Sequence, residues 1–168
     1  MKILKYVFLF VCISGIAQTK VGTIDVDFIL SKMPELTQVQ KDVDAYGQTL
    51  QTDFDKKMTA YNSAIEKYKE EEASLTLAQK KTRQDSIIAM EGEMQRYNEN
   101  AGKLITLKRE ELLSPLYQKI GVQIEKIAKA EGYTQIMQQN INIIYVDNRF
   151  DITLSVIKAL GIVLKEGE

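Results

Sequence analysis

Apolar residues recur every three or four positions along most of the chain, from about Pro34 to Glu131. The first stretch follows a near-heptad spacing, with a local irregularity between Leu50 and Met58. Its members are Leu36, Val39, Val43, Tyr46, Leu50, Phe54, Met58, Tyr61, Ile65 and Tyr68. The second stretch comprises Ile87, Met90, Met94, Tyr97, Ala101, Leu104, Ile105, Leu112, Leu116 and Ile120. Because residues three and four apart share one helix face, both stretches predict long amphipathic helices.

The apolar pattern is interrupted between the two stretches, over residues 70–76. Directly afterwards, Thr76 and Gln79 have the spacing of a capping box, which starts a new helix. We therefore expect an antiparallel helical hairpin with its tip near residue 75, each arm extending roughly 60 Å for about 40 residues. The tip contains neither Gly nor Pro, so a single unbroken rod is the alternative.

Short β-type segments flank this helical region. Residues 20–26 alternate apolar and polar positions, which predicts a strand. Asp27 is then expected to cap a brief helix that ends near Met33, and Pro34 suits the first turn of the next helix. Towards the other end, Ser114 and Pro115 predict a break or kink in the returning arm.

The C-terminal part predicts a helix stop at Gly132 and two further strands, Tyr133–Met137 and Ile141–Val146. A turn at residues 147–149 follows, and Asp151 is expected to cap a last helix that runs to about residue 160.

A hairpin returns the chain to its starting point, so the strands should pair into one small sheet. The predicted class is α+β, mostly α. A β-rich oligomerisation body with a C-terminal helix (18–33 and 132–168) carries a hairpin arm (34–131). Three short strands bury too little surface to be stable alone, which favours self-association.

The first residues predict a secretory signal peptide, 1–17, with two early lysines, an apolar run at 6–16 and cleavage before Gln18. The apolar run is shorter than the roughly 20 residues that a membrane span needs, which disfavours the alternative of an uncleaved anchor. A lipoprotein attached through Cys12 is a second alternative, but the small residue expected before such a cysteine is absent.

Composition excludes most catalytic chemistry. The single cysteine, Cys12, lies in the predicted signal, and the chain has no histidine. Disulfides, thiol nucleophiles, imidazole bases and the usual zinc ligands are therefore not expected in the mature chain. We expect no enzyme activity, cofactor or metal site.

The formal charge of −1 falls to about −3 without Lys2 and Lys5, so nucleic acid is not an expected partner. The carboxylates of Asp25 and Asp27, and those of residues 70–72, are interpreted as structural or solvated.

Residues at the two ends of the predicted arm resemble a known family. The N-terminal match is residues 21–26 (VGTIDV) followed by 29–35 (ILSKMPE). The C-terminal match comprises residues 112–117 (LLSPLY), 127–129 (IAK), 131–133 (EGY), 144–147 (IYVD) and 151–153 (DIT). Their order and spacing resemble the Skp/OmpH family of periplasmic chaperones over nearly all of the mature chain.

This resemblance implies a homotrimer with a small β-body, whose helical arms enclose a cavity for unfolded outer-membrane proteins without using ATP. The sequence is consistent with the last point, since it has no Gly-rich phosphate loop. The best-known members are strongly basic, whereas residues 34–131 carry 15 Lys/Arg against 17 Asp/Glu. Electrostatic capture of clients or of lipopolysaccharide is therefore in question for this chain.

A chaperone of this kind binds many sequences weakly, which flexible and amphipathic side chains favour. The candidate client-binding residues are Met58, Tyr61, Tyr68, Met90, Met94 and Tyr97. The alternative is that this stripe only packs the two helices together. The tyrosines are the better candidates, since a phenol tolerates partial exposure.

Glycines predict a soft joint in the arm. If the tip lies near residue 75, Gly47 faces Gly102, with Gly92 further out. An interior helix glycine costs about 1 kcal/mol relative to alanine. The alternative is close helix packing around small residues.

The expected trimer contacts are Val21, Ile24, Val26, Ile136, Ile143 and Tyr145.

The alternative function is a coiled-coil spacer or adaptor of the cell envelope that binds a folded partner. Such an adaptor should not bind several unrelated unfolded chains.

Overall fold

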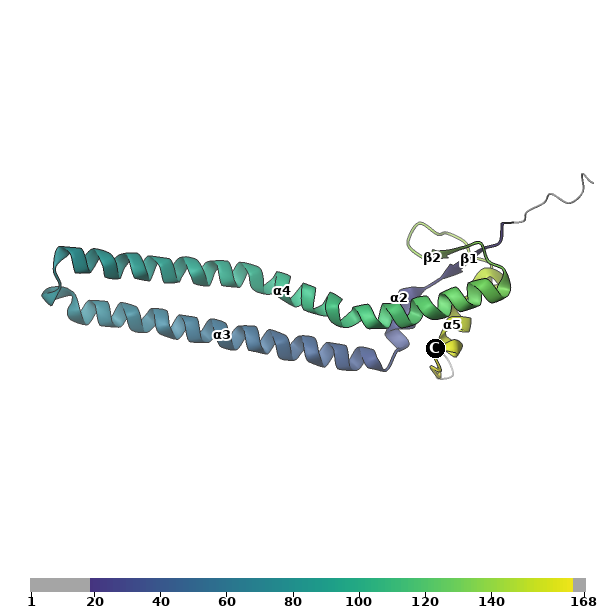
Figure 1. Cartoon of the computed structure of the whole chain (residues 1–168), viewed down its shortest axis with the longest axis horizontal. Coiled ribbons are helices and arrows are strands. Elements are labelled where there is room, and N and C mark those ends of the chain that lie inside the picture. Colours follow the sequence, from purple (N-terminus) through teal and green to yellow (C-terminus); the bar gives the residue numbers. More distant parts are fainter. Residues whose placement is uncertain (1–18, 165–168) are drawn as a thin grey trace, which may run out of the picture. The chain divides into compact units, whose positions relative to one another are not determined.

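The computed structural model describes residues 19–164, so the predicted signal peptide and its cleavage site lie outside the described residues. The chain divides into two compact units. Residues 34–117 form the hairpin unit, and the segments before and after them form the β unit. The predicted class, a long helical hairpin with a small β-containing part, is confirmed (Figure 1).

The hairpin unit consists of two antiparallel helices. Helix α3 (Glu35–Glu71) begins directly after Pro34, whose φ of −62° is already helical. A 3₁₀ turn, η1 (Glu72–Ser74), follows, and the chain returns in helix α4 (Leu77–Glu131), which runs beside α3 (Figure 1). The reversal lies where the apolar stripe is interrupted, and the single-rod alternative is wrong.

The tip is fixed by the predicted capping box. The backbone N–H of Gln79 donates to Thr76 Oγ1 at 3.4 Å, and the N–H of Thr76 donates to Gln79 Oε1 at 3.0 Å. Two backbone donors that the first turn of α4 leaves without helical partners are thus satisfied by side chains.

Of the break or kink predicted at Ser114 and Pro115, the break is wrong, because α4 continues through Pro115. Proline inside a helix removes one hydrogen bond and costs about 3 kcal/mol. Leu116 and Ile120, one turn apart, are buried to 5% and 1% exposure. Burial of such aliphatic side chains contributes about 1.5–3 kcal/mol each, which offsets the cost of the proline.

The sheet of the β unit has two parallel strands, β1 (Val21–Ile24) and β2 (Gln135–Gln138). The register pairs Val21 with Gln135. On the other side of β1, Thr23 forms a parallel bridge with Asp151, and the N–H of Ile152 donates to the Thr23 carbonyl at 2.9 Å. The expected pairing of the two sequence ends is confirmed, with β1 in the middle.

The first strand is shorter than expected, because helix α2 (Val26–Lys32) begins directly after it. Asp25, not Asp27, is its cap: the N–H of Phe28 donates to Asp25 Oδ1 at 2.8 Å. A cap residue needs extended backbone, which Asp25 has at φ −101° and ψ 93°. Asp27 lies in the first turn, where its negative charge stabilises the helix by interacting with the positive end of the helix dipole.

The expected strand Ile141–Val146 is not a strand in this structure. A β-type pattern forms a strand only where another strand supplies hydrogen bonds, and none does so within the described chain. Ile141 and Ile144 are 98% and 99% exposed, and Tyr145 is 82% exposed.

The chain ends in a 3₁₀ turn, η2 (Asn148–Phe150), and helix α5 (Thr153–Ala159). The N-cap is Ile152 rather than the predicted Asp151, but Asp151 stands directly before it and its Oδ1 accepts the N–H of Thr153 at 2.8 Å. Gly132 and Gly161, with φ of 72° and 74°, follow the ends of α4 and α5, as expected of glycine stops.

The core of the β unit is small and aliphatic. Its buried members are Ile24, Ile29, Leu30, Met33, Ile120, Ile152, Val156 and Ile157. Thr153, also buried, joins three elements: its Oγ1 donates to Asp151 and accepts from the N–H of Asp25 at 2.9 Å. This hydroxyl therefore fixes α5 to the end of β1.

We predict that Gly22→Ala destabilises the β unit. A Cβ at Gly22 would lie 2.8 Å from both Ile136 Cδ1 and a Tyr133 ring carbon, and such overpacking costs about 1–3 kcal/mol. Denaturant unfolding at a fixed protein concentration measures the change. Gly121→Ala is the matched control. It lies inside α4 with nothing within 4 Å and should stabilise by about 0.5–1 kcal/mol. Equal stability of the two variants would contradict the prediction.

Candidate functional site

The two hairpin helices are packed unevenly along their length. Near the base, Val39, Val43 and Leu50 are 8%, 3% and 8% exposed. Between residues 51 and 115, all of which the structure describes, no residue is buried. We call residues 51–100 the outer hairpin, and 34–50 with 101–117 the inner hairpin.

An aromatic cluster lies at the border between these sections. The rings of Phe54 on α3 and Tyr97 on α4 stack with centroids 6.4 Å apart, and the Tyr97 hydroxyl donates to the Leu50 carbonyl at 3.3 Å. Lys57 Nζ lies 5.5 Å from the centre of the Tyr97 ring and pairs with Glu93 on α4. We call Phe54, Lys57, Glu93 and Tyr97 the mid-arm clasp.

The ion pair of the clasp is solvent-exposed. Its hydrogen bond raises the pKa of Lys57 and lowers the pKa of Glu93. Exposed pairs of this kind are screened by salt and add little to stability. The pair therefore aligns α3 with α4 more than it holds them together.

Two open hollows lie between the helices of the outer hairpin. One is lined by Lys57, Ala60, Met90, Glu93 and Met94. The other, near the tip, has a volume of about 500 Å³ and is lined by Ile65, Tyr68, Lys69, Glu72, Gln84, Ile87 and Ile88. Each combines apolar walls with a charged rim, which suits contact with varied side chains.

The predicted client-binding residues are spread over these features. Met90 and Met94 share one hollow, and Tyr68 lines the other, where its hydroxyl accepts from Gln84 Nε2 at 2.8 Å. Met58 is 41% exposed and Tyr61 is half-buried. Tyr97 belongs to the clasp, so its ring already packs against α3.

Sequence reasoning missed two exposed apolar residues, Ile88 and Leu77, which are 64% and 87% exposed. Both lie outside the apolar stripe: Ile88 directly follows the stripe residue Ile87, and Leu77 is the first residue of α4. The sequence did contain a signal for them, because each is an apolar residue at a position where the helical periodicity predicts a solvent-exposed polar one.

The three arm glycines do not fill one close contact. A Cβ at Gly47 would lie 3.9 Å from Ile105 Cδ1, an ordinary distance, and one at Gly92 would lie 3.5 Å from Arg96 Nη1. A Cβ at Gly102 would have nothing within 4 Å. Gly47 therefore faces Ile105, whereas the sequence had predicted that it faces Gly102. None of the three positions is too crowded for alanine.

The expected trimer contacts differ in accessibility. Ile24 is 2% exposed and belongs to the core of its own β unit, whereas Val21 and Tyr145 are 37% and 82% exposed. The remaining members, Val26, Ile136 and Ile143, are half-buried.

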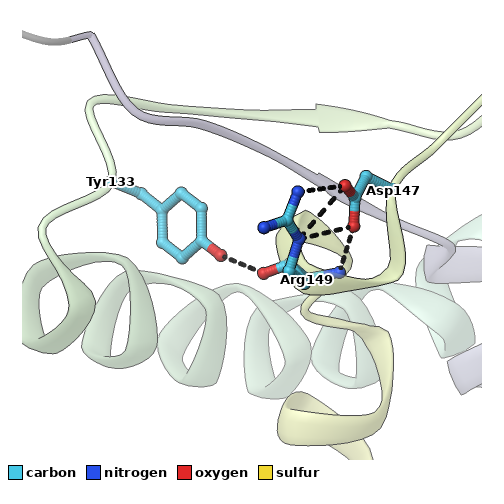
Figure 2. Close-up of polar contacts among 3 residues, drawn as sticks. All are labelled: Tyr133, Asp147 and Arg149. Carbon is cyan, nitrogen blue, oxygen red and sulfur yellow. Dashed lines mark hydrogen bonds and ion pairs between the residues drawn. The ribbon is translucent and has the colours of Figure 1, made fainter.

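A polar cluster orders the turn after the exposed segment 141–145. Figure 2 shows the Arg149 side chain folded back on Asp147, with Nη2 2.7 Å from Oδ2, and the Tyr133 hydroxyl on the other side of Arg149. The Arg149 backbone N–H also donates to Asp147 Oδ1 at 3.0 Å, and Tyr133 donates to the Arg149 carbonyl at 3.4 Å. The hydrogen bonds from the Arg149 side chain and backbone N–H lower the pKa of Asp147 to about 2.

The described residues contain no group of three or more metal-ligating side chains placed to hold an ion. Of the helices in the described part of the chain, none has the length and apolar character to cross a membrane.

Comparison with known proteins places this architecture in a family. The sequence model of the family described as "Outer membrane protein (OmpH-like)" matches residues 20–160. The chain belongs to the OmpH-like family. No curated protein matches it significantly.

A solved structure has the same fold as this OmpH-like chain. It is the crystal structure of a proposed outer membrane chaperone (OmpH-like) from Caulobacter crescentus. The TM-score is 0.64 at 16% identity, with 87% of this chain and 86% of that chain covered. At this identity the likeness establishes the fold.

We predict that Asp147 titrates near pH 2, against about 3.9 in an unfolded chain. Since folding lowers this pKa, the contribution of Asp147 to stability is present above about pH 4 and is lost as the pH falls through 2. Carboxyl-carbon NMR measures the midpoint. Arg149→Ala should return it towards the unfolded value, while Lys158→Ala in α5 should leave it unchanged. An Asp147 midpoint near 4 in the unmodified chain would contradict the assignment.

Proposed function

We propose that this OmpH-like protein is a periplasmic holdase chaperone, which binds unfolded outer-membrane proteins and keeps them soluble for membrane insertion without ATP. Membership of the family supports the proposal, as does the fold shared with the proposed outer membrane chaperone of Caulobacter crescentus. The predicted signal peptide is consistent with export to the periplasm.

The observation that carries the proposal is the unburied apolar surface of the outer hairpin. Met58 and Ile88 are 41% and 64% exposed, and Met90 and Met94 line an open hollow. Methionine side chains are flexible and polarizable, so they adapt to many partners. A surface of this kind fits weak binding of diverse unfolded segments.

The proposed assembly is a homotrimer formed through the β unit, with clients held in the cavity between the arms. Within the described residues, β2 is paired on one side only, with β1. In the segment 141–145, the β-type residues Ile141, Ile144 and Tyr145 are almost fully exposed. Covering both by neighbouring subunits would remove an open strand edge and bury Tyr145 and Val21.

Glycines 47, 92 and 102 are the proposed joint that lets the arm bend and the cavity widen. None of the three is required by close packing. Each glycine therefore lowers helix stability without allowing a tighter contact between the helices. Bending at this level moves the outer parts of α3 and α4 together.

The first test of the function removes exposed apolar side chains. The double variant Met58→Ser/Ile88→Ser should need about tenfold more chaperone to suppress aggregation of a urea-unfolded outer-membrane barrel, since each buried side chain of this size contributes about 1 kcal/mol or more. Light scattering after dilution of the barrel measures the effect.

The matched control is Thr59→Ser/Ala89→Ser, at the neighbouring positions of the same helices, which should act like the unmodified chain. Suppression of one barrel but of no unrelated unfolded chain would instead indicate an adaptor. Undiminished suppression by Met58→Ser/Ile88→Ser would contradict the assignment of the surface.

The joint is tested by Gly47→Ala/Gly102→Ala. Each replacement favours the helix by about 1 kcal/mol, so nearby amides should exchange about fivefold more slowly per glycine. Hydrogen exchange measured by mass spectrometry reports the change, with Gly121→Ala in the β unit as the control. Identical exchange around residues 47 and 102 in both proteins would rule out the joint.

A further inference from the structure

The outer hairpin is joined across its length by contacts unlike those of the inner hairpin. Leu50 is the last buried residue of α3, and beyond it the structure describes no buried residue before Leu116 on α4. Buried apolar packing therefore ends at Leu50. The boundary follows from the burial of side chains on α3, since the first buried side chain of α4 is Leu116.

Beyond the boundary, the hydrogen bonds and ion pairs between α3 and the returning chain are exposed to solvent, and the apolar side chains between the two helices are at most half-buried. Within the clasp Lys57 pairs with Glu93, and near the tip Tyr68 accepts from Gln84. Arg83 Nη2 also lies 3.3 Å from Glu71 Oε2. Water can replace such contacts at little cost, because exposed hydrogen bonds and ion pairs exchange readily for solvation.

The last partly buried contact before this polar section is made by the clasp. The Tyr97 hydroxyl reaches across to the Leu50 carbonyl, and its ring stacks on Phe54. Leu50 is thus both the last buried residue of α3 and the acceptor of this hydrogen bond. The clasp marks the point at which buried packing gives way to exposed contacts.

We propose that the outer hairpin opens as a unit by separation of α3 from α4, while the inner hairpin stays closed, with the mid-arm clasp and its Tyr97–Leu50 hydrogen bond as the boundary. Opening would expose the inward apolar side chains of Ile65, Ile87, Met90 and Met94. Local opening of this kind is expected where few apolar side chains are buried. It differs from bending at the glycines, because bending leaves the distance between facing helices unchanged. It does not depend on the proposed chaperone function.

Pairs of spin labels test the separation directly. The outer pair Glu66→Cys/Asp85→Cys and the inner pair Gln48→Cys/Lys103→Cys occupy exposed positions at matching levels of the two helices. The chain from Gln18 contains no other cysteine. Refolding the labelled chain from denaturant with a large excess of unlabelled chain leaves at most one labelled copy in each assembly.

Electron–electron double resonance then gives the distance distribution for each pair. The outer pair should show a second population at longer distance, and the inner pair a single narrow one. A single narrow distribution for both pairs, or equally broad ones, would overturn the proposal.

The clasp is tested by Tyr97→Phe, which keeps the ring and removes the hydroxyl that donates to Leu50. Loss of one hydrogen bond should increase the long-distance population of the outer pair about threefold and leave the inner pair unchanged. Tyr61→Phe is the matched control, because the Tyr61 hydroxyl makes no hydrogen bond within residues 19–164. An equal effect of the two variants would rule out the clasp as the boundary.

Discussion

The parallel pairing of β1 with β2 is the constraint on which the rest of the fold depends. Lys20 and Thr134, 114 residues apart, are joined by a backbone hydrogen bond of 2.8 Å, and Gln139 donates to the Ile24 carbonyl at 2.7 Å. Parallel neighbours cannot be joined by a tight turn and need a crossover connection. Here that connection contains two long helices, so the chain between the strands has to leave and return. The hairpin follows from this requirement, and the reversal is set by the Thr76 capping box.

Stability and exposure are divided along the same lines. The β unit and the inner hairpin contain every buried hydrophobic residue of the described chain. The outer hairpin keeps its apolar side chains half-buried or exposed, and exposed polar contacts align its helices. The proposed holdase function would benefit from this division, because binding surface can rearrange without loss of the fold. The acidic balance of the helical region agrees with apolar rather than electrostatic contact.

Much of the fold could be predicted from local patterns, and the errors arise where distant contacts decide. The 3.6-residue period and the Thr76–Gln79 spacing are local, so the helices and the tip were predicted correctly. A break at Pro115 was one of the two predicted outcomes, because burial of Leu116 and Ile120 cannot be read from their neighbours. Residues 141–146 have a strand pattern but no partner in the described chain, and pairing is not a local property. For the candidate site, periodicity identified the half-buried stripe, while Ile88 and Leu77 lie outside it.

The central claim is that exposed apolar surface on a helical hairpin holds unfolded outer-membrane proteins in solution. Sedimentation velocity of the mature chain, alone and after dilution of a urea-unfolded outer-membrane barrel into it, tests this most directly. The account predicts a trimer that takes up the barrel into one discrete, faster-sedimenting complex. A chain that sediments unchanged while the barrel aggregates would contradict it.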